Sequence, residues 1–180
     1  MSIANEPILI GYLPKHIHRR PDWLKNPRVH EICSASNCIS SPPDGWFEHW
    51  LHNECWVFPN EDSARKVIPG DQMGLYELHA YRMFPVRFDE GREEAFLIPE
   101  MNIQPLRSSY ARLGYDAVSR QMDNEFECSP LSCNHGAEQF EVNEHCLVDT
   151  AERALQLALE FSRGEWEPGP YYVVEVLRGE

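Results

Sequence analysis

Cys33-Ser-Ala-Ser-Asn-Cys38 is the stretch around which this chain is organised, because it returns later as Cys128-Ser-Pro-Leu-Ser-Cys133. In both places an Asn-Glu pair and a third cysteine follow, at Cys55 and at Cys146. All six cysteines of the 180-residue chain therefore belong to one arrangement that occurs twice. An internal repeat identifies the unit from which a fold is built.

The repeat extends into the flanking sequence. In each copy a strand-like segment precedes the cysteines, a helical stretch follows them, and a β-like run closes the unit. In the first copy these segments are residues 8–15, 60–68 and 74–84, and in the second copy they are residues 113–120, 150–162 and 170–178. The first strand is expected to end at Pro14, and the last to be central in a sheet because only Glu175 interrupts its apolar residues. Two β-α-β units predict an α+β fold, which we expect to be a ferredoxin-like (split βαβ) sheet with its helices on one face.

This repeat also predicts the domain organisation. The first unit, with a hairpin extension, takes residues 1–100, a connector takes 101–112, and the second unit takes 113–180. A chain of this length suits one globular domain in which the two units share a core.

The charge of the chain is acidic and unevenly distributed. The net charge is −13, with a balance of +3 in residues 1–30 and −16 in the remainder. So acidic a body should repel nucleic acid, and its natural complement is a basic partner protein. The alternative is that the charge only keeps the protein soluble. The sequence shows neither a secretory signal pattern nor a membrane-spanning run, which predicts a cytoplasmic protein.

A reducing cytoplasm leaves several interpretations of the cysteines open. They can be buried thiols that serve only as small core residues, because reduced cysteine packs as an apolar side chain. They can ligate zinc, since paired cysteines followed by further Cys or His residues are typical of zinc sites. One such site would use Cys33, Cys38 and Cys55 with His52 or His49, and the other Cys128, Cys133 and Cys146 with His145 or His135.

Two further interpretations involve thiol chemistry. Cys38 or Cys133 could act as a nucleophile if a base or a helix N-terminus stabilised its thiolate. A disulfide could also form within either Cx4C pair, under oxidative stress. The sequence has no P-loop, GxGxxG or HExxH motif, so nucleotide, dinucleotide and zincin chemistry have no support.

A second candidate site lies at the end of the first strand. It is a cationic run that could hold a phosphate or carboxylate, formed by Lys15, His16, His18, Arg19 and Arg20. The alternative is a solvated loop that neutralises acidic neighbours.

These observations favour a small acidic cytoplasmic protein that binds a partner or a small ligand without being an enzyme. The alternatives are a zinc-binding structural or sensor protein and a cysteine-dependent enzyme. The expected cofactor is accordingly none or zinc.

Overall fold

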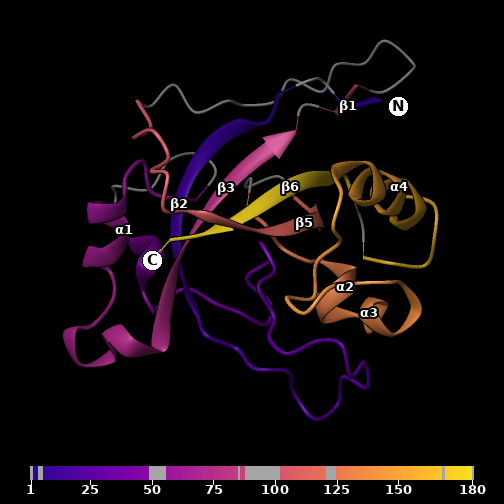
Figure 1. The fold of residues 1–180 in the computed structure, drawn as a ribbon, viewed down its shortest axis with the longest axis horizontal. Helices are drawn as coiled ribbons and strands as arrows, with labels where there is room; N and C mark the ends of the chain where they lie inside the picture. The colour runs from indigo at the N-terminus through magenta and orange to yellow at the C-terminus, as the bar shows by residue number, and fades with distance from the viewer. Residues whose placement is uncertain are drawn as a thin grey trace.

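A four-stranded antiparallel sheet forms the centre of the molecule (Figure 1). The computed structural model describes residues 2–3, 6–48, 56–84, 86–87, 102–120, 125–167 and 169–179. The strand order is β2-β3-β6-β5, and the strands are β2 (Ile8–His16), β3 (Tyr76–Phe84), β6 (Tyr171–Arg178) and β5 (Ala111–Ser119). Two short strands, β1 (Ser2–Ile3) and β4 (Val86–Arg87), pair separately. The predicted α+β class is confirmed.

The helices lie around this sheet. Figure 1 shows α1 (Glu61–Lys66) beside β2 and α4 (Ala151–Phe161) beside β5 and β6, with α2 (Pro130–Cys133) and α3 (Gly136–Gln139) next to each other. Two 3-10 helices, η1 (Trp46–Glu48) and η2 (Gly70–Leu75), complete the described set. Both predicted helices are confirmed. They start with a side-chain cap, because Asn60 accepts a hydrogen bond from the Ser63 amide and Thr150 accepts one from the Arg153 amide.

The strand positions confirm one sequence prediction and correct another. β6 is a central strand, as its apolar composition predicts. The prediction that Pro14 ends the first strand is wrong, since β2 continues to His16 and pairs Pro14 with Leu78. An edge strand tolerates proline because its outer side needs no ladder hydrogen bond.

The ferredoxin-like topology is also wrong. In a split βαβ sheet the two strands of one unit are separated by a strand of the other unit. Here β2 pairs directly with β3, and β5 with β6, and both pairings are antiparallel. The right-handed crossover rule applies only to parallel strands, so it does not constrain this fold.

The two halves share local backbone features at their first strands. β2 and β5 each have a register irregularity next to a glycine with positive φ, Gly11 at 141° and Gly114 at 151°. A Cβ at Gly11 would lie 2.6 Å from the Phe58 carbonyl oxygen, and a Cβ at Gly114 would lie 2.9 Å from the Val148 carbonyl oxygen. Only glycine fits where the chain approaches this closely. The residues that follow form equivalent bridges, Tyr12 with Phe58 and Tyr115 with Val148.

Each face of the sheet has a different covering. The strand register places Tyr115 and Ala117 on the face that packs against α4. Tyr12 shares this face and hydrogen-bonds to Gln104, whose side chain accepts from the first amide of α1. The opposite face carries five acidic or basic residues among apolar and tyrosine side chains, namely Lys15, Glu77, His79, Asp116 and Arg178. The loops that carry Cys38 and Cys128 contact this second face, where Lys15 bonds to Ser36 and Asp116 bonds to Ser34 and Ser129.

Candidate metal centre

Three thiols from distant parts of the chain meet over the second face of the sheet. The Sγ atoms of Cys38, Cys128 and Cys133 all lie within 4.8 Å of one another. Cys38 is exposed, Cys133 is partly exposed and ends α2, and Cys128 is buried. We call this set the trithiol cluster. It differs from the predicted sites, because it takes one cysteine from the first repeat and two from the second.

Lys15 fixes the loop that carries Cys38. Its side chain extends from β2 and is 1% exposed. The ammonium group donates to Ser36 O at 2.7 Å, to Asn37 Oδ1 at 2.9 Å and to Ala35 O at 3.4 Å. Three acceptors match the three donors of a protonated lysine. Burial lowers the pKa of Lys15 to about 7, against the opposing effect of nearby Asp116 and the cysteine thiols.

Asp116 joins both cysteine loops to the sheet. It is fully buried in β5 and accepts hydrogen bonds from Ser129 Oγ at 2.5 Å, Ser34 Oγ at 2.7 Å and the Ala35 amide at 3.0 Å. Burial raises the pKa of Asp116, although these hydrogen bonds oppose the effect. Sequence reasoning missed this residue. The available signal was a carboxylate within an otherwise apolar strand, which needs partners if it is buried.

The three thiols share their protons unequally. Hydrogen bonds with Cys128 and Cys133 lower the pKa of Cys38, and the bonds with Cys133 and Cys38 raise the pKa of Cys128. The pKa of Cys133 is raised by its contact with Cys38 and by burial, although its hydrogen bond with Cys128 acts in the opposite direction. The directions of these shifts favour ionisation of Cys38 over that of Cys128 and Cys133. Deprotonation of all three needs a cation that replaces the protons, as thiophilic metal ions do.

The donor set fits a thiophilic metal. Zinc binds thiolate sulfur at about 2.3 Å, so the sulfur atoms of a tetrahedral site lie about 3.8 Å apart. The trithiol cluster would need to contract by no more than about 1 Å to reach that spacing. Soft thiolate ligands select zinc and Cu(I) over magnesium and calcium.

A second group within metal-binding distance contains Glu31, Cys33 and His145. Glu31 Oε1 already accepts from His145 Nδ1 at 2.7 Å and from an Arg178 guanidinium nitrogen at 2.8 Å. This group offers a single thiol, and its other two members are already paired, Glu31 with Arg178 and His145, and His145 also with Glu144. This group is better explained as part of an ion-pair chain than as a metal site.

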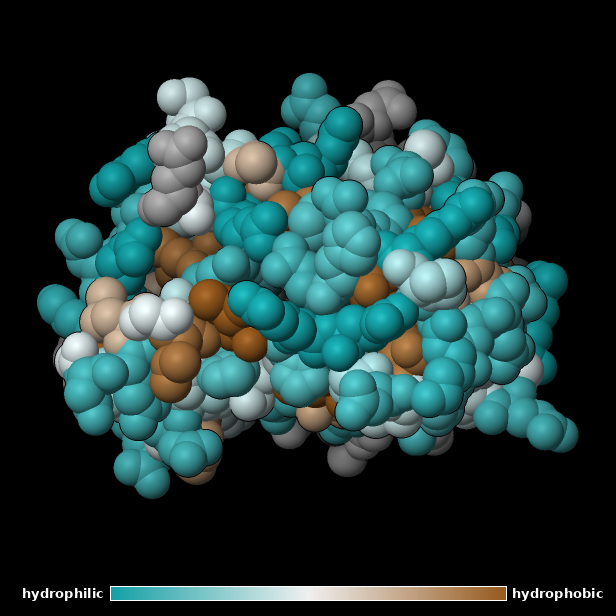
Figure 2. Space-filling model, turned by 60° about the horizontal axis from the view of Figure 1, so that its bottom comes forward, coloured by the Kyte–Doolittle hydropathy of each residue, from teal (hydrophilic) through white to brown (hydrophobic). Residues whose placement is uncertain are grey.

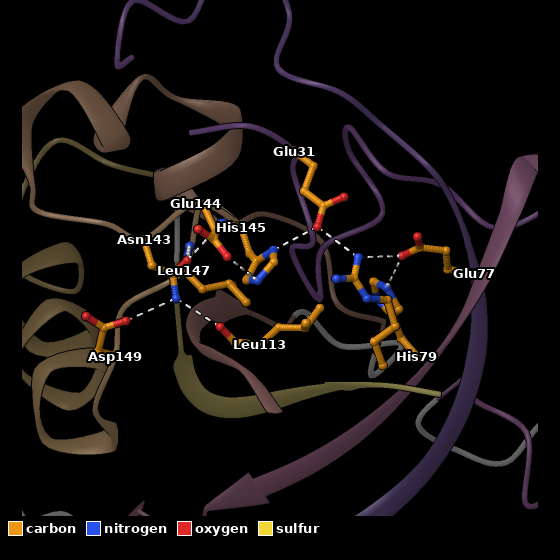
Figure 3. Close-up of polar contacts among 10 residues, drawn as sticks. Glu31, Glu77, His79, Leu113, Asn143, Glu144, His145, Leu147 and Asp149 are labelled. Carbon is orange, nitrogen blue, oxygen red and sulfur yellow. Dashed lines mark hydrogen bonds and ion pairs between the residues drawn. The ribbon is translucent and has the colours of Figure 1, made fainter. Parts of the chain in front are cut away.

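Figure 3 shows that chain, which runs from β3 to the loop before α4. Glu77 contacts His79 Nε2 at 3.6 Å and accepts from Arg178 at 3.0 Å, and His145 Nε2 lies 3.5 Å from Glu144. Together with Glu31, these contacts join the sheet to both covering loops. Burial raises the pKa of Glu31, but hydrogen bonds from Arg178 and His145 outweigh this effect and hold that pKa below its usual value.

The ion-pair chain predicts acid sensitivity. The contacts of Glu77 with His79 and Arg178 lower its pKa from 4.5 to about 2. Because this folded-state pKa is depressed, the stabilisation is present above pH 4.5 and is lost as the pH falls towards 2. We expect the free energy of unfolding of the metal-free protein to fall by about 1–3 kcal/mol from this residue over that range.

Urea unfolding at several pH values, with and without Glu77→Gln, measures this contribution. Glu141→Gln is the matched control, because Glu141 is exposed and its ion pair among the described residues is with exposed Arg28. If Glu77→Gln leaves the slope of stability against pH unchanged below pH 4.5, the assigned role of Glu77 is wrong.

The predicted cationic site is divided by the fold. Lys15 points into the protein and is no part of a surface patch, which corrects the prediction for this residue. The His16 ring packs edge-on against Tyr76, and burial lowers the pKa of His18. Arg19 and Arg20 are exposed and line an open cavity of about 290 Å³ with Pro27, Val29 and His30. Anion binding there stays a prediction.

The remaining predicted ligands do not join the trithiol cluster in the part of the chain that the structure describes. Cys146 is fully buried, has a φ of 63° and directs its thiol to Leu131 O at 3.6 Å. His145 belongs to the ion-pair chain. Cys55 and His52 lie outside the described residues.

Comparison of the chain with protein-family models, with curated proteins and with solved structures finds no significant match. Among the described residues, no helix is long and apolar enough to cross a membrane. The function is therefore inferred from the geometry of the chain itself.

Proposed function

We propose that this protein binds one thiophilic metal ion, Zn²⁺, through Cys38, Cys128 and Cys133. The observation that carries this proposal is the convergence of three sulfur atoms within 4.8 Å of one another. Three thiolates in such a group are costly without a cation, because like charges at short range disfavour ionisation. A bound Zn²⁺ removes that cost and forms three strong bonds.

The surroundings of the trithiol cluster support this assignment. Zn²⁺ with three thiolates would carry a net charge of about −1, and Lys15, when protonated, places a positive charge beside the loop that carries Cys38. The hydrogen bonds from Lys15 and those to Asp116 hold the loop before Cys38 and the segment after Cys128. Partners of this kind orient metal ligands and raise their affinity.

In this proposal the metal acts as a link between two loops. Cys38 belongs to the loop after β2, while Cys128 and Cys133 follow β5. Zinc would therefore join covering segments that come from opposite edges of the sheet. Because Cys38 is exposed, the site would also exchange with metal in solution, as a sensor requires.

Metal analysis of protein purified without added metal tests the proposal. We expect about one Zn²⁺ per chain and a rise in the unfolding temperature when zinc is added to the metal-free protein. A zinc content well below one per chain, with no shift in unfolding temperature on zinc addition, would reject it.

We also infer that the two halves descend from one duplicated unit. The matched glycines, bridges and helix caps of the two halves support this origin. The backbone match pairs Cys146 with Trp56, since both have positive φ just before the bridge residues. This alignment differs by one residue from the one that the cysteines suggest.

Binding of a basic partner stays a prediction, as do a thiol-dependent activity and a cytoplasmic location. The net charge of −13 supports the partner. Figure 2 shows a largely hydrophilic surface with a hydrophobic area on the side that α1 and η2 occupy in Figure 1. Affinity capture from lysate at low and high salt tests for such a partner.

A further inference from the structure

Access to solvent differs among the three sulfur atoms of the trithiol cluster. Cys38 is exposed, Cys133 is partly exposed, and Cys128 is 7% exposed. Residues 34–43, which carry Cys38, form neither helix nor strand. A small oxidant in solution would therefore reach Cys38 first.

The contacts of the loop select the second thiol. Ser36 Oγ lies 3.6 Å from Cys133 Sγ and also accepts from the Cys38 amide at 3.1 Å, so the Cys38 turn contacts Cys133 through Ser36. The Cys38 thiol itself donates to Glu127 O at 2.9 Å, a backbone atom and not the Cys128 sulfur. Cys128 is held differently. Its amide donates to Ser119 Oγ at 3.1 Å, and its thiol faces Asn134 Oδ1 at 3.9 Å.

We propose that a peroxide converts Cys38 and Cys133 into a disulfide that joins the two repeats. This pair differs from the Cx4C pairs that the sequence suggests, since it takes one cysteine from each. The step requires the two sulfur atoms to move from within 4.8 Å to bonding distance, about 2.05 Å.

The chemistry balances with one peroxide for each disulfide. The Cys38 sulfur attacks a peroxide oxygen, the O–O bond breaks, and a sulfenic acid and one water are formed. The Cys133 sulfur then attacks the sulfenic sulfur, the S–S bond forms, and a second water leaves. The two thiols together lose two protons and two electrons, which the peroxide accepts, and a dithiol reductant reverses the change.

Oxidation would also control the metal. A disulfide between Cys38 and Cys133 removes two of the three proposed ligands and leaves Cys128 alone. Bound Zn²⁺ should then be released. This consequence rests on the proposed function, whereas formation of the disulfide does not.

Mass spectrometry of the full-length, metal-free protein tests the disulfide. The protein is treated with hydrogen peroxide, its remaining thiols are alkylated under denaturing conditions, and the digested peptides are mapped. We expect four alkylated cysteines of the six and a Cys38–Cys133 cross-link. Cys38→Ser should abolish the cross-link without disturbing packing, because the side chain is exposed, and Cys146→Ser should retain it.

A Cys128–Cys133 cross-link, a cross-link through any other cysteine, or six thiols that remain alkylatable would overturn the proposal. A second measurement uses zinc-loaded protein and a chromophoric chelator. Release of about one Zn²⁺ per chain on peroxide treatment supports the coupling. If the protein binds zinc but forms no disulfide, the inference about oxidation is wrong and the proposed function stands. If the disulfide forms in a protein that never binds zinc, the inference is supported and the proposed function is wrong.

Discussion

Replacing Cys133 with serine is expected to lower the affinity for Zn²⁺ by at least about 100-fold, more than the 10- to 100-fold cost of losing an outer partner. A serine hydroxyl does not ionise at neutral pH, so the variant loses one of three proposed metal bonds. Cys128→Ser should have a similar effect, since both sulfur atoms belong to the trithiol cluster. Competition with a chromophoric chelator of known affinity measures the change.

Cys146→Ser is the matched control for these variants. Cys146 is also a buried cysteine of the second repeat, but it lies outside the trithiol cluster and donates to Leu131 O, as a serine could. Its zinc affinity should stay within about threefold of the wild type. Equal losses in Cys146→Ser and Cys133→Ser would indicate a general folding defect, and no loss in Cys133→Ser would contradict the assigned ligand set.

The second large effect is expected at Asp116. Asp116→Ala removes the acceptor of three buried hydrogen bonds, from the hydroxyls of Ser129 and Ser34 and from the Ala35 amide. Each donor left without a partner costs about 1–3 kcal/mol, so the free energy of unfolding should fall by about 3 kcal/mol or more. Zinc affinity should fall as well, because the segments that present Cys38 and Cys128 lose their common anchor.

Urea unfolding of the metal-free protein measures the stability change. Asp116→Asn, which keeps one carbonyl acceptor, should give an intermediate loss and remains informative if Asp116→Ala does not fold. Asp149→Ala is the matched control, because its described side-chain contact is a single exposed one with Asn143, and its cost should stay below about 1 kcal/mol. A loss below about 1 kcal/mol in Asp116→Ala would show that the loops are held in another way.

Local sequence patterns predict the elements of this fold well. Asn60 and Thr150 cap the two predicted helices, and the apolar run around Glu175 occupies a central strand. These features depend on residues a few positions apart, whose hydrogen bonds and burial repeat with the period of a helix or strand. The strand order could not be obtained in this way, because a helix between two strands is compatible with both adjacent and separated pairing.

The candidate site shows the same limit. Sequence grouped the cysteines by repeat and assigned Lys15 to a surface patch, whereas the fold turns Lys15 inward to hold the Cys38 loop. The side of the sheet on which a residue lies depends on strand register, and the bulges at Gly11 and Gly114 shift that register by one position.

Local patterns in the sequence are enough to predict the two capped helices, the four strands of the sheet and the set of thiols available for chemistry. The tertiary structure alone decided that Cys38 meets Cys128 and Cys133, while Cys33 and Cys146 lie elsewhere. The physical reason is that the two cysteine loops pack on the same face of one sheet, where the hydrogen bonds of Lys15 and Asp116 hold them together. Contacts of this kind join residues far apart in the chain, and no local periodicity encodes them.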